Sequence, residues 1–498
     1  MLNDYWKHFK SGTDIRAVAM DGVEGEPCEL TDEVVEKIVF GFARWLSEKA
    51  GKDCSNLTVA VGRDSRLSGP RIAGVVARTL SSVGMKVLDC GLSSTPAMFM
   101  TTVDLSCDAS IQITASHHPW HRNGLKFFLP TGGVEGSDIT AILEYTQAGQ
   151  KPAPAQGTVE QVPYMVQYAA RLRDLIVRES DNGEQPLAGL HIVVDAGNGA
   201  GGFYATEVLK PLGADISGSQ FLEPDGSFPN HIPNPENPDA MASVCQAVKA
   251  AGADLGVIFD TDVDRAGCVG ADGREINRNR LVALAAAIAL DGNEGGTIVT
   301  DSITSTGLKT FIENTLGGVH CRFKRGYKNV INEAIRLNNE GINAPLAIET
   351  SGHAALRDNY FLDDGAYLST KIIIKAVQMR KEGKALEDLI AALPEPVEGY
   401  EIRYTITEPD FKAYGEKVLS DLEQYAKQNG WVLADDSREG VRVSFPKGSG
   451  DGWFLLRLSV HDPVMPLNVE SDIKGGCDIM LQQLAPFMEK QTALRRKS

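Results

Sequence analysis

Short apolar runs alternate with longer amphipathic runs through roughly the first 390 residues of the chain. Runs such as LTVAVG, HIVVD and LGVIF are short and rich in β-branched residues, which is typical of strands. The run TDEVVEKIVFGFARWLSEKAG has apolar residues at helical spacing, and it predicts a helix that begins after Thr31 and ends at Gly51. This alternation favours α/β domains in this part of the chain.

The pattern changes near residue 397. One long helix is predicted in DFKAYGEKVLSDLEQYAKQNG, strands in GVRVSFPKGSGDGWFLLRLSV, and a last helix after them, which indicates a smaller α+β domain. The proline-containing segments KPAPAQG and LPEPVEGYE and the turn in GADGREINRNR separate the predicted modules. We therefore expect four domains, at residues 1–153, 154–274, 275–396 and 397–498.

Three of the predicted strands start alike and lead into polar loops. ASIQITASHHP, ADLGVIFDTDVDR and APLAIETSGHA each begin with Ala, continue through a short apolar strand and end in a polar loop. Open α/β sheets bind their ligands just past the carboxyl ends of their strands. Three modules then offer a loop from the same end of a sheet, although chance can also produce such a pattern.

The first of these loops, QITASHHPWHRNGLK, crowds a serine, three histidines and two basic residues past DASIQI, which predicts a half-buried strand. Ser116 is a candidate nucleophile in this position. An ordinary surface loop fits the segment equally well, so the two interpretations stay open here.

The second loop, DTDVDR, places Asp260, Asp262 and Asp264 on one side of an extended or loosely turned segment. Three close carboxylates repel one another unless a cation neutralises them, and oxygen ligands suit Mg²⁺, Mn²⁺ or Ca²⁺. A calcium-binding EF-hand is excluded, because its positions for Gly and Glu are occupied by Arg265 and Ala271. A solvated acidic loop is the remaining alternative.

The segment DAGNGAGG fits the pattern G-x-G-x-x-G through Gly197, Gly199 and Gly202. This pattern keeps an NAD(P)-dependent oxidoreductase among the candidate functions. We favour backbone packing at a tight turn between a strand and a helix, because no acidic residue closes a second strand at the expected distance. The chain contains no Walker A sequence, which argues against a P-loop kinase or ATPase.

Three further polar loops are ETSGH, KRGYKN and RLSVHDP. Glu349, Ser351 and His353 alternate donors and acceptors that suit sugar hydroxyls. Arg457, Ser459 and His461 suit a phosphate, for which arginine supplies a bidentate contact. Each loop alone is compatible with a solvated turn, but together they describe a nucleophilic hydroxyl, a metal site, a hydroxyl-binding loop and an anion clamp.

Composition excludes several classes of partner. A net charge of −17 and a pI of about 5.1 argue against nucleic acid and anionic membranes, so an anionic ligand needs locally gathered Arg and Lys. The N-terminus lacks an apolar signal core, and the longest apolar run, LVALAAAIAL, is about half of a bilayer span. Since the eight cysteines form no C-x-x-C pair, we expect no zinc site, and we expect a cytoplasmic protein.

The polar motifs occur together in a known order. TASHHP, DTDVDR, ETSGH and RLS occur one in each predicted domain, with SGTDIR and VGRDSRLSGP before them. This set resembles the α-D-phosphohexomutase superfamily, which includes phosphomannomutase/phosphoglucomutase and phosphoglucosamine mutase, and the resemblance covers essentially the whole chain. It implies three similar α/β domains with mixed sheets followed by a smaller α+β domain, around a central cleft.

The resemblance also implies an activity. Members of this family are phosphoserine enzymes that interconvert hexose 1- and 6-phosphates through a 1,6-bisphosphate, an intramolecular phosphoryl transfer that uses Mg²⁺. The four domains then carry the phosphoserine, metal-binding, sugar-recognition and phosphate-binding loops in chain order. The expected partners are a sugar phosphate and, as primer, a hexose 1,6-bisphosphate; the oligomeric state expected is a monomer or a small homo-oligomer.

The matching positions give the expected site residues. The catalytic residues are Ser116, His117, Lys126, Arg16 and Arg265. The Mg²⁺ ligands are a phosphate oxygen on Ser116 with Asp260, Asp262 and Asp264. The substrate-binding residues are Lys324, Arg325, Gly326, Tyr327, Lys328, Glu349, Ser351, His353, Arg457, Ser459 and His461. Lys126 and His117 are both candidates for moving the hydroxyl proton.

This chain departs from the family pattern at three places. His118 stands where Asn is usual, Val460 and His461 replace Gly or Asn and Thr in the phosphate loop, and the N-terminal motif is one glycine short. ETSGH favours mannose and glucose phosphates as substrates, with glucosamine phosphate as the alternative. The departures keep a non-catalytic sugar-phosphate-binding protein in view beside the oxidoreductase.

If His461 must be cationic to bind phosphate, substrate binding weakens above about pH 7, because an ordinary histidine loses its proton near that pH. KM measured between pH 6 and pH 8 is then expected to rise with pH. A flat KM over this range would contradict the role of His461.

Overall fold

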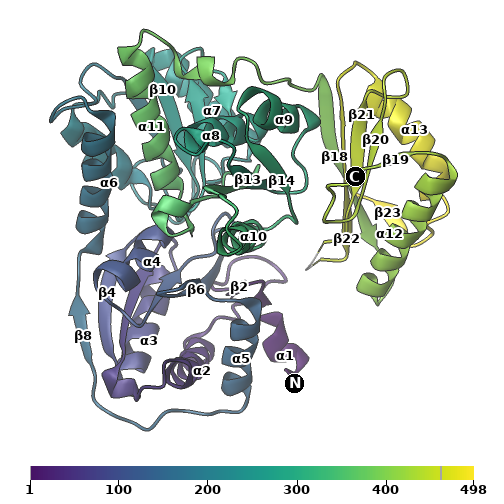
Figure 1. Cartoon of the computed structure of the whole chain (residues 1–498). Helices are drawn as coiled ribbons and strands as arrows, with labels where there is room; N and C mark the ends of the chain where they lie inside the picture. The colour runs from purple at the N-terminus through teal and green to yellow at the C-terminus, as the bar shows by residue number, and fades with distance from the viewer. Residues whose placement is uncertain (1, 460–461, 498) are drawn as a thin grey trace. The chain divides into compact units, whose positions relative to one another are not determined.

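The computed structural model describes residues 2–459 and 462–497, and these form two compact units. The first unit contains the chain up to Asn277 together with Ser351–Glu387. The second unit contains Arg278–Thr350 together with the chain from Asp388 onward. Figure 1 labels the helices and many of the strands of both units.

An eight-stranded mixed sheet opens the first unit. Its strands lie in the order β1 (Lys10–Ser11), β2 (Asp14–Val18), β6 (Arg122–Leu129), β5 (Ala109–Ile113), β3 (Thr58–Arg63), β4 (Lys86–Leu92) and β8 (Thr158–Gln161), with β7 (Gly132–Gly133) paired to β6. Strands β5, β3, β4 and β8 run parallel, whereas β6, β2 and β1 pair antiparallel. The turn between β5 and β6 contains the TASHHP loop.

Helices pack on this sheet. The helices are α1 (Asp4–His8), α2 (Asp32–Ala50), α3 (Gly69–Ser81), α4 (Thr95–Asp104) and α5 (Gly136–Gln147). Helices α2, α3 and α5 share one hydrophobic core with the strands, and α4 packs on β3, β5 and β6. Helix α2 has the predicted ends: the Thr31 hydroxyl accepts from the N–H of Val34, and Gly51 terminates the helix with φ of 63°.

Strand β5 differs from its prediction. The sequence predicts a half-buried strand, but all five residues of β5 are buried. The strand is flanked in the sheet by β3 and β6 and is packed by both α3 and α4, so its polar positions are enclosed as well. Gln112 satisfies its side chain by donating to the Ser93 carbonyl at 2.8 Å.

A second mixed sheet lies in the same unit. Its order is β12 (Glu275–Ile276), β11 (Ala266–Gly270), β10 (Leu255–Phe259) and β9 (Ile192–Asp195), and only the pair β9–β10 is parallel. Helix α7 (Pro238–Ala251) packs on β9, β10 and β11; α11 (Gly365–Lys381) packs on β10, β11 and α6 (Tyr164–Ser180). The antiparallel pair β16 (Ala354–Leu356) and β17 (Leu362–Asp363) precedes α11.

Residues 351–387, which contain β16, β17 and α11, return to the first unit after a part of the chain that belongs to the second unit. In the first unit the Tyr168 hydroxyl donates to the carboxylate of Asp364 at 2.7 Å.

The second unit begins with parallel strands. Strand β13 (Thr297–Thr300) pairs in parallel with β14 (Val319–Arg322) and β15 (Leu346–Ile348). The helices of this segment are α8 (Asn279–Leu290), α9 (Thr306–Thr310) and α10 (Tyr327–Asn339). The longest apolar run of the sequence forms most of α8.

The C-terminal part of the second unit is an antiparallel sheet with two helices. Its six strands lie in the order β19 (Val432–Leu433), β20 (Val441–Phe445), β21 (Gly452–Leu456), β22 (Val464–Ser471), β18 (Glu398–Ile406) and β23 (Leu494–Arg496). Helices α12 (Phe411–Gln428) and α13 (Gly476–Met488) complete its core. The predicted fold class is confirmed: three α/β domains with mixed sheets precede a C-terminal antiparallel-sheet domain. The four domain boundaries stay a prediction.

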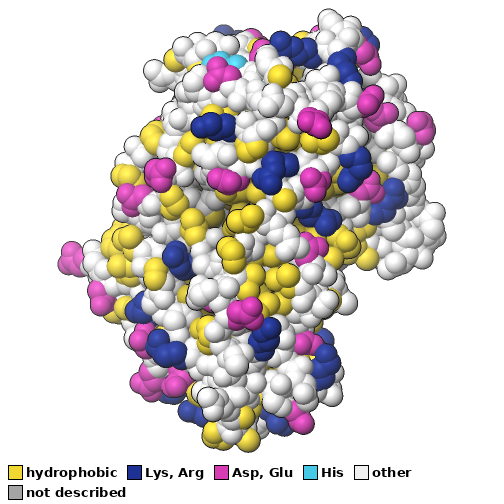
Figure 2. Space-filling view, turned by 90° about the vertical axis from the view of Figure 1, so that its left-hand side faces the viewer, with side chains coloured by type: hydrophobic (Ala, Val, Ile, Leu, Met, Phe, Trp, Pro, Cys, Tyr) yellow, Lys and Arg dark blue, Asp and Glu magenta, His cyan; other side chains and the backbone are white. Residues whose placement is uncertain are grey.

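Charged side chains of both signs are intermingled on the face shown in Figure 2, with hydrophobic atoms between them. Among the described residues, none of the helices combines the length and the apolarity that crossing a bilayer requires.

A buried arginine stabilises the second unit. Arg442 in β20 is 2% exposed, and its guanidinium stacks on the Trp453 ring at 3.5 Å. The guanidinium donates to the carbonyl oxygens of Ser302 at 3.0 Å and Thr304 at 3.1 Å, which follow β13. This residue therefore joins the parallel strands to the C-terminal sheet.

Replacing Arg442 by Met is expected to lower the free energy of unfolding of the second unit by about 3 kcal/mol, because two buried carbonyls lose their donor. Guanidinium chloride unfolding followed by tryptophan fluorescence measures this change. Lys417→Met is the control, since Lys417 is an exposed helix residue paired with Asp421, and its loss costs roughly 0.3–0.5 kcal/mol. Equal stability of the two variants would contradict the prediction.

Candidate active site

Ser116 lies in a strained turn after β5. Its backbone is left-handed, with φ of 48°, and its N–H donates to the Thr114 hydroxyl at 2.9 Å. The Ser116 hydroxyl donates to Asp260 Oδ2 at 3.0 Å and accepts from Arg265 Nη2 at 2.7 Å. A buried serine oxygen is thus fixed between a carboxylate and a guanidinium.

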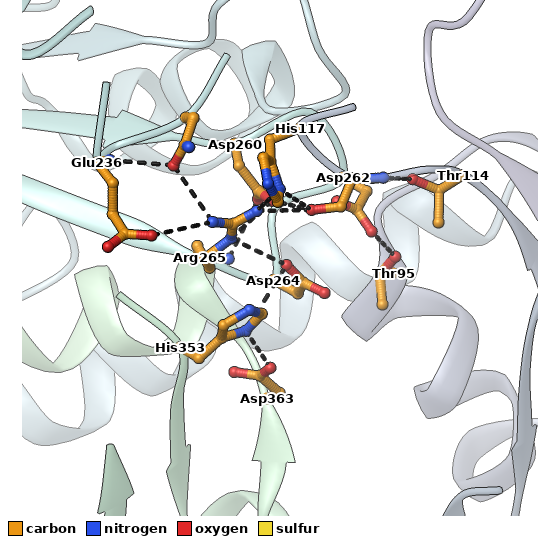
Figure 3. Close-up of polar contacts among 12 residues, drawn as sticks. Thr95, Thr114, His117, Glu236, Asp260, Asp262, Asp264, Arg265, His353 and Asp363 are labelled. Carbon is orange, nitrogen blue, oxygen red and sulfur yellow. Dashed lines mark hydrogen bonds and ion pairs between the residues drawn. The ribbon is translucent and has the colours of Figure 1, made fainter. Parts of the chain in front are cut away.

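The three aspartates follow β10 and point toward the same place (Figure 3). Asp260, Asp262 and Asp264 are at most 1% exposed, and they offer carboxylate oxygens that all lie within 4.8 Å of one another. Asp262 accepts a hydrogen bond from Thr95, and Asp264 accepts one from Lys126 Nζ at 2.7 Å. Strand β6 and helix α4 therefore supply donors to this loop.

Burial and mutual repulsion set the charges of these carboxyl groups. Burial first, and then the neighbouring carboxylates, raise the pKa of Asp260 well above its ordinary value and also raise the pKa of Asp262. Burial acts in the same direction on Asp264, but Lys126, His353 and Arg265 outweigh it and lower the pKa of Asp264. Ionisation of all three carboxyl groups together is therefore unfavourable unless a further cation joins them.

This cluster fits a divalent cation. Oxygen Oδ1 of Asp262 and Oδ1 of Asp264 are buried and have no hydrogen-bond partner among the described residues. Oxygen donors of this kind are those that Mg²⁺ prefers, and a cation would relieve the repulsion. The fit of Asp260, Asp262 and Asp264 to Mg²⁺ therefore rests on unsatisfied oxygens as well as on residue type.

Arg265 is the centre of the hydrogen-bond network in Figure 3. It is 2% exposed, and its Nε donates to Asp260 Oδ2 at 3.2 Å. Its Nη1 donates to Asn234 Oδ1 at 3.2 Å, and Nη2 contacts both Ser116 and the ring nitrogen Nδ1 of His117. The guanidinium plane is therefore fixed from three directions.

The two histidines after Ser116 are uncharged at neutral pH. Burial, and then the charge of Arg265, lower the pKa of His117 to about 2. Burial, and then Arg16, lower the pKa of His118 to about 3. His118 stands at a departure from the family pattern, and its titration lies well below the physiological range.

The other expected residues of the first unit lie around the aspartates. Arg16 is on β2 opposite Gly124 of β6, and it donates to Asp14 at 2.7 Å. The ring of His353 contacts Asp363 and lies 3.9 Å from Asp264 Oδ1. Burial opposes the charged form of His353, but these two carboxylates outweigh it and raise the pKa of His353 to about 9. Asp264, His353 and Asp363 form a second group of possible metal ligands.

Ser351 is buried and belongs to the first unit, and the other remaining expected residues belong to the second unit. Glu349 accepts from the N–H of Gly326 at 2.6 Å, so it ties β15 to the KRGYKN loop. Arg457 is 9% exposed; its burial, and then the charge of Arg325, lower its pKa. Ser459 donates its N–H to the Val464 carbonyl at 2.9 Å. Lys324, Tyr327 and Lys328 lie in or next to the KRGYKN turn, at the start of α10, and His461 is outside the described residues.

The G-x-G-x-x-G segment has a packing explanation. A Cβ atom at Gly199 would lie 2.6 Å from the Thr261 carbonyl oxygen, and one at Gly202 would lie 2.1 Å from that of Leu222. The N–H of Ala200 donates to Thr261 at 2.8 Å. Both glycines are therefore required by close backbone packing, in agreement with the interpretation favoured from the sequence, and Gly199 packs against the loop of three aspartates.

Several residues that contact the candidate active site were not identified from the sequence. Thr95, Asn234 and Asp363 lie far along the chain from the residues they contact, and none carries a local signal of that contact. The contact of Thr114 could have been predicted, because the hydroxyl of a threonine often accepts the N–H of the residue two positions later in a turn, here Ser116. Arg66 also had a signal, in the motif VGRDSRLSGP, and its guanidinium binds the Ser116 loop.

Three family models match the chain. They are the α/β/α domains I, II and III of phosphoglucomutase/phosphomannomutase, at residues 14–152, 167–273 and 277–397.

Individual relatives match over most of their length. The chain is 31% identical over 434 residues to the phosphomannomutase/phosphoglucomutase of Pseudomonas aeruginosa, covering 86% of this chain and 88% of the relative. It is 29% identical to the phosphoglucomutase of Neisseria gonorrhoeae, covering 96% of this chain and 97% of the relative. The crystal structure of a phosphoglucomutase/phosphomannomutase family protein from Burkholderia thailandensis is similar with a TM-score of 0.80 at 28% identity, covering 99% of this chain and 98% of that one.

Replacing Asp262 by Asn is expected to weaken Mg²⁺ or Mn²⁺ binding at least about tenfold, because one charged ligand is lost. Without metal the same variant is expected to melt at a higher temperature than the parent, since one carboxylate no longer repels the others. Titration calorimetry and thermal unfolding measure the two effects.

Asp363→Asn is the matched control, because Asp363 belongs only to the second group of possible ligands. Its metal affinity is expected to stay within about twofold of the parent's. The reverse pattern would place the cation on Asp264, His353 and Asp363.

Proposed function

Since the chain belongs to the phosphoglucomutase/phosphomannomutase family, we propose that it interconverts hexose 1-phosphates and hexose 6-phosphates, with glucose and mannose as the sugars. Ser116 is the residue that carries the phosphoryl group in this proposal. The reaction proceeds through a hexose 1,6-bisphosphate, which also serves as the primer that first phosphorylates Ser116.

The position of the Ser116 hydroxyl is the observation that carries the proposal. Its oxygen lies between Asp260 and Arg265, beside a buried cluster of carboxylates suited to a cation. Phosphoryl transfer requires mainly in-line positioning and neutralisation of the charge on the phosphoryl oxygens. A fixed serine oxygen supports the first requirement, and the adjacent guanidinium supports the second.

The forward half of the reaction moves one phosphoryl group. The bond between phosphorus and Ser116 Oγ breaks, a bond forms between phosphorus and the free hydroxyl of the hexose monophosphate, and the hydroxyl proton leaves. The resulting bisphosphate reorients and returns its other phosphoryl group to Ser116, while a proton returns to the hexose hydroxyl that is released. Atoms and charge therefore balance over the full cycle.

Asp260, Asp262 and Asp264 would hold Mg²⁺ beside this reaction. A bound Mg²⁺ supplies positive charge that polarises the phosphoryl group. Arg265 adds charge from the protein itself, because its Nη2 already contacts the oxygen to which the phosphoryl group is attached.

Two residues remain candidates for moving the proton. His117 Nδ1 lies 3.3 Å from Ser116 Oγ, but its lowered pKa of about 2 makes it a weak base. The Lys126 ammonium is held by Asp264 at 2.7 Å and must first lose a proton to act as a base. A phosphate dianion near His117 would raise the pKa of that ring, which favours His117 as an acceptor once substrate is bound.

Substrate binding is assigned in this proposal to the loops of the second unit and to Ser351 and His353. The buried charge of Arg457 beside Arg325 supports a role in holding phosphate, because a partly desolvated guanidinium is stabilised by an anion. Glu349, with Ser351 and His353, is assigned to the sugar hydroxyls. Glucosamine phosphate is the alternative substrate.

Ser116→Ala is expected to reduce turnover at least about 10³-fold with the fold intact, because it removes the phosphoryl acceptor. Ser110→Ala is the matched control, since Ser110 is a buried serine on the preceding strand whose hydroxyl has no hydrogen-bond partner among the described residues. Near-normal turnover by Ser116→Ala would contradict the proposal.

The substrates are tested side by side. Glucose 1-phosphate, mannose 1-phosphate and glucosamine 1-phosphate are supplied with Mg²⁺ and a trace of hexose 1,6-bisphosphate, and phosphate on Ser116 is followed by mass spectrometry. Turnover that is fastest on glucosamine 1-phosphate would favour the alternative substrate. Binding without turnover and without phosphoserine would instead indicate a sugar-phosphate-binding protein. Tight binding of NAD(P) would indicate an oxidoreductase.

A further inference from the structure

Arg66 is a buried cation whose guanidinium contacts the backbone of the Ser116 loop. It follows β3, and its side chain is 0% exposed. Its Nη1 donates to the carbonyl oxygens of Pro119 at 2.8 Å and Arg122 at 2.9 Å. Its Nη2 donates to those of Ser116 at 2.5 Å and His118 at 2.6 Å. One guanidinium therefore binds four carbonyls of a single seven-residue segment.

The guanidinium itself is fixed on its other sides. Its Nε lies 3.3 Å from the buried Asp64 carboxylate, whose Oδ1 also accepts the N–H of Arg66 at 2.9 Å. The Phe228 ring covers it at 5.2 Å. Gly226 packs on the segment that contains Arg66 itself: a Cβ atom at Gly226 would lie 2.4 Å from backbone atoms of Ser65 and Leu67. Arg66 is thus a rigid, water-excluded support.

This support has a consequence for the nucleophile. Four carbonyl oxygens that point to one place repel one another unless a cation lies between them. The loop that brings them together also contains Ser116 in a left-handed conformation, which a serine adopts only where its surroundings impose it. Binding of the Ser116 carbonyl to Arg66 opposes rotation of that residue out of the conformation that directs its hydroxyl to Asp260 and Arg265.

We propose that Arg66 is a positioning residue for phosphoryl transfer: by binding the carbonyls of Ser116, His118, Pro119 and Arg122, it holds the serine oxygen in line for reaction. This inference rests on the proposed function of Ser116. Lysine cannot replace arginine here, because four acceptors on two nitrogens require the planar fork of a guanidinium. Arg66 does not touch the transferred group in this assignment.

The test compares Arg66→Lys and Arg66→Ala with the parent enzyme. In Arg66→Lys, kcat is expected to fall about 100-fold while KM changes less than about threefold, because the nucleophile is misplaced and the substrate contacts are intact. Millimolar guanidinium is expected to restore part of the kcat lost in Arg66→Ala, an effect that a general loss of stability would not produce. Hydrogen exchange of residues 114–122 is expected to speed up in both variants.

Arg71→Lys and Arg71→Ala are the matched controls. Arg71 also donates to two backbone carbonyls, those of Ala19 and Leu30 at 2.9 Å, but it lies 35% exposed and does not contact the Ser116 loop. Its variants are expected to keep the parent's kcat, KM and exchange rates in residues 114–122.

The outcomes separate the two proposals. A parent enzyme inactive on all three sugar phosphates would overturn the proposed function, and exchange of residues 114–122 would then decide alone whether Arg66 holds the loop. An active parent with unchanged kcat and exchange in Arg66→Lys would overturn the role of Arg66 and leave the proposed function standing. If neither Arg66 variant folds, Arg66 is a requirement for folding and the positioning role is wrong.

Discussion

Repulsion among buried carboxylates is the constraint on which the first unit depends. Asp260, Asp262 and Asp264 are enclosed where water cannot screen them, so each must be paired, protonated or bound to a cation. The donors that meet this need come from distant parts of the chain: Lys126 from β6 and Thr95 from the start of α4. The same contacts join the eight-stranded sheet to the four-stranded sheet. The contacts that Lys126 and Thr95 make with the aspartates therefore stabilise the carboxylates and hold the two sheets together at the same time.

Electrostatic attraction also holds the backbone of the site, but here a buried cation attracts the negative ends of carbonyl dipoles. Asp260 is a buried carboxyl group that contacts the guanidinium of Arg265, whereas Arg66 is a buried cation that contacts carbonyl oxygens. Ser116 lies at the junction, with its carbonyl on one cation and its hydroxyl on another, Arg265. A serine with a strained backbone is thereby kept in one orientation without a covalent restraint.

The sequence predicted those features that depend on neighbouring residues alone. Thr31 and Gly51 end α2 as predicted, and the spacing of the three aspartates alone indicated a cation site. The burial of β5 was not predicted, because polar residues such as Gln112 find partners only after helices cover both faces. The return of residues 351–387 to the first unit was also missed, since a helical pattern does not reveal which sheet it packs on. Contacts such as that of Asn234 with Arg265 depend on the fold as a whole.

In a protein with a net charge of −17, the phosphate binding that we propose depends on individual buried arginines of the second unit. Its buried arginines differ in how fully they are satisfied. Arg442 has two carbonyls and a tryptophan ring, and Arg322 has Asp436 at 2.6 Å. Arg457 has Glu401 only at 3.8 Å, and its buried Nε has no hydrogen-bond partner among the described residues. A guanidinium left in that state is stabilised by an incoming phosphate far more than a solvated one would be, because its desolvation has already occurred on folding. Local burial of one arginine, rather than a basic surface, therefore supports the phosphate binding that we propose for Arg457.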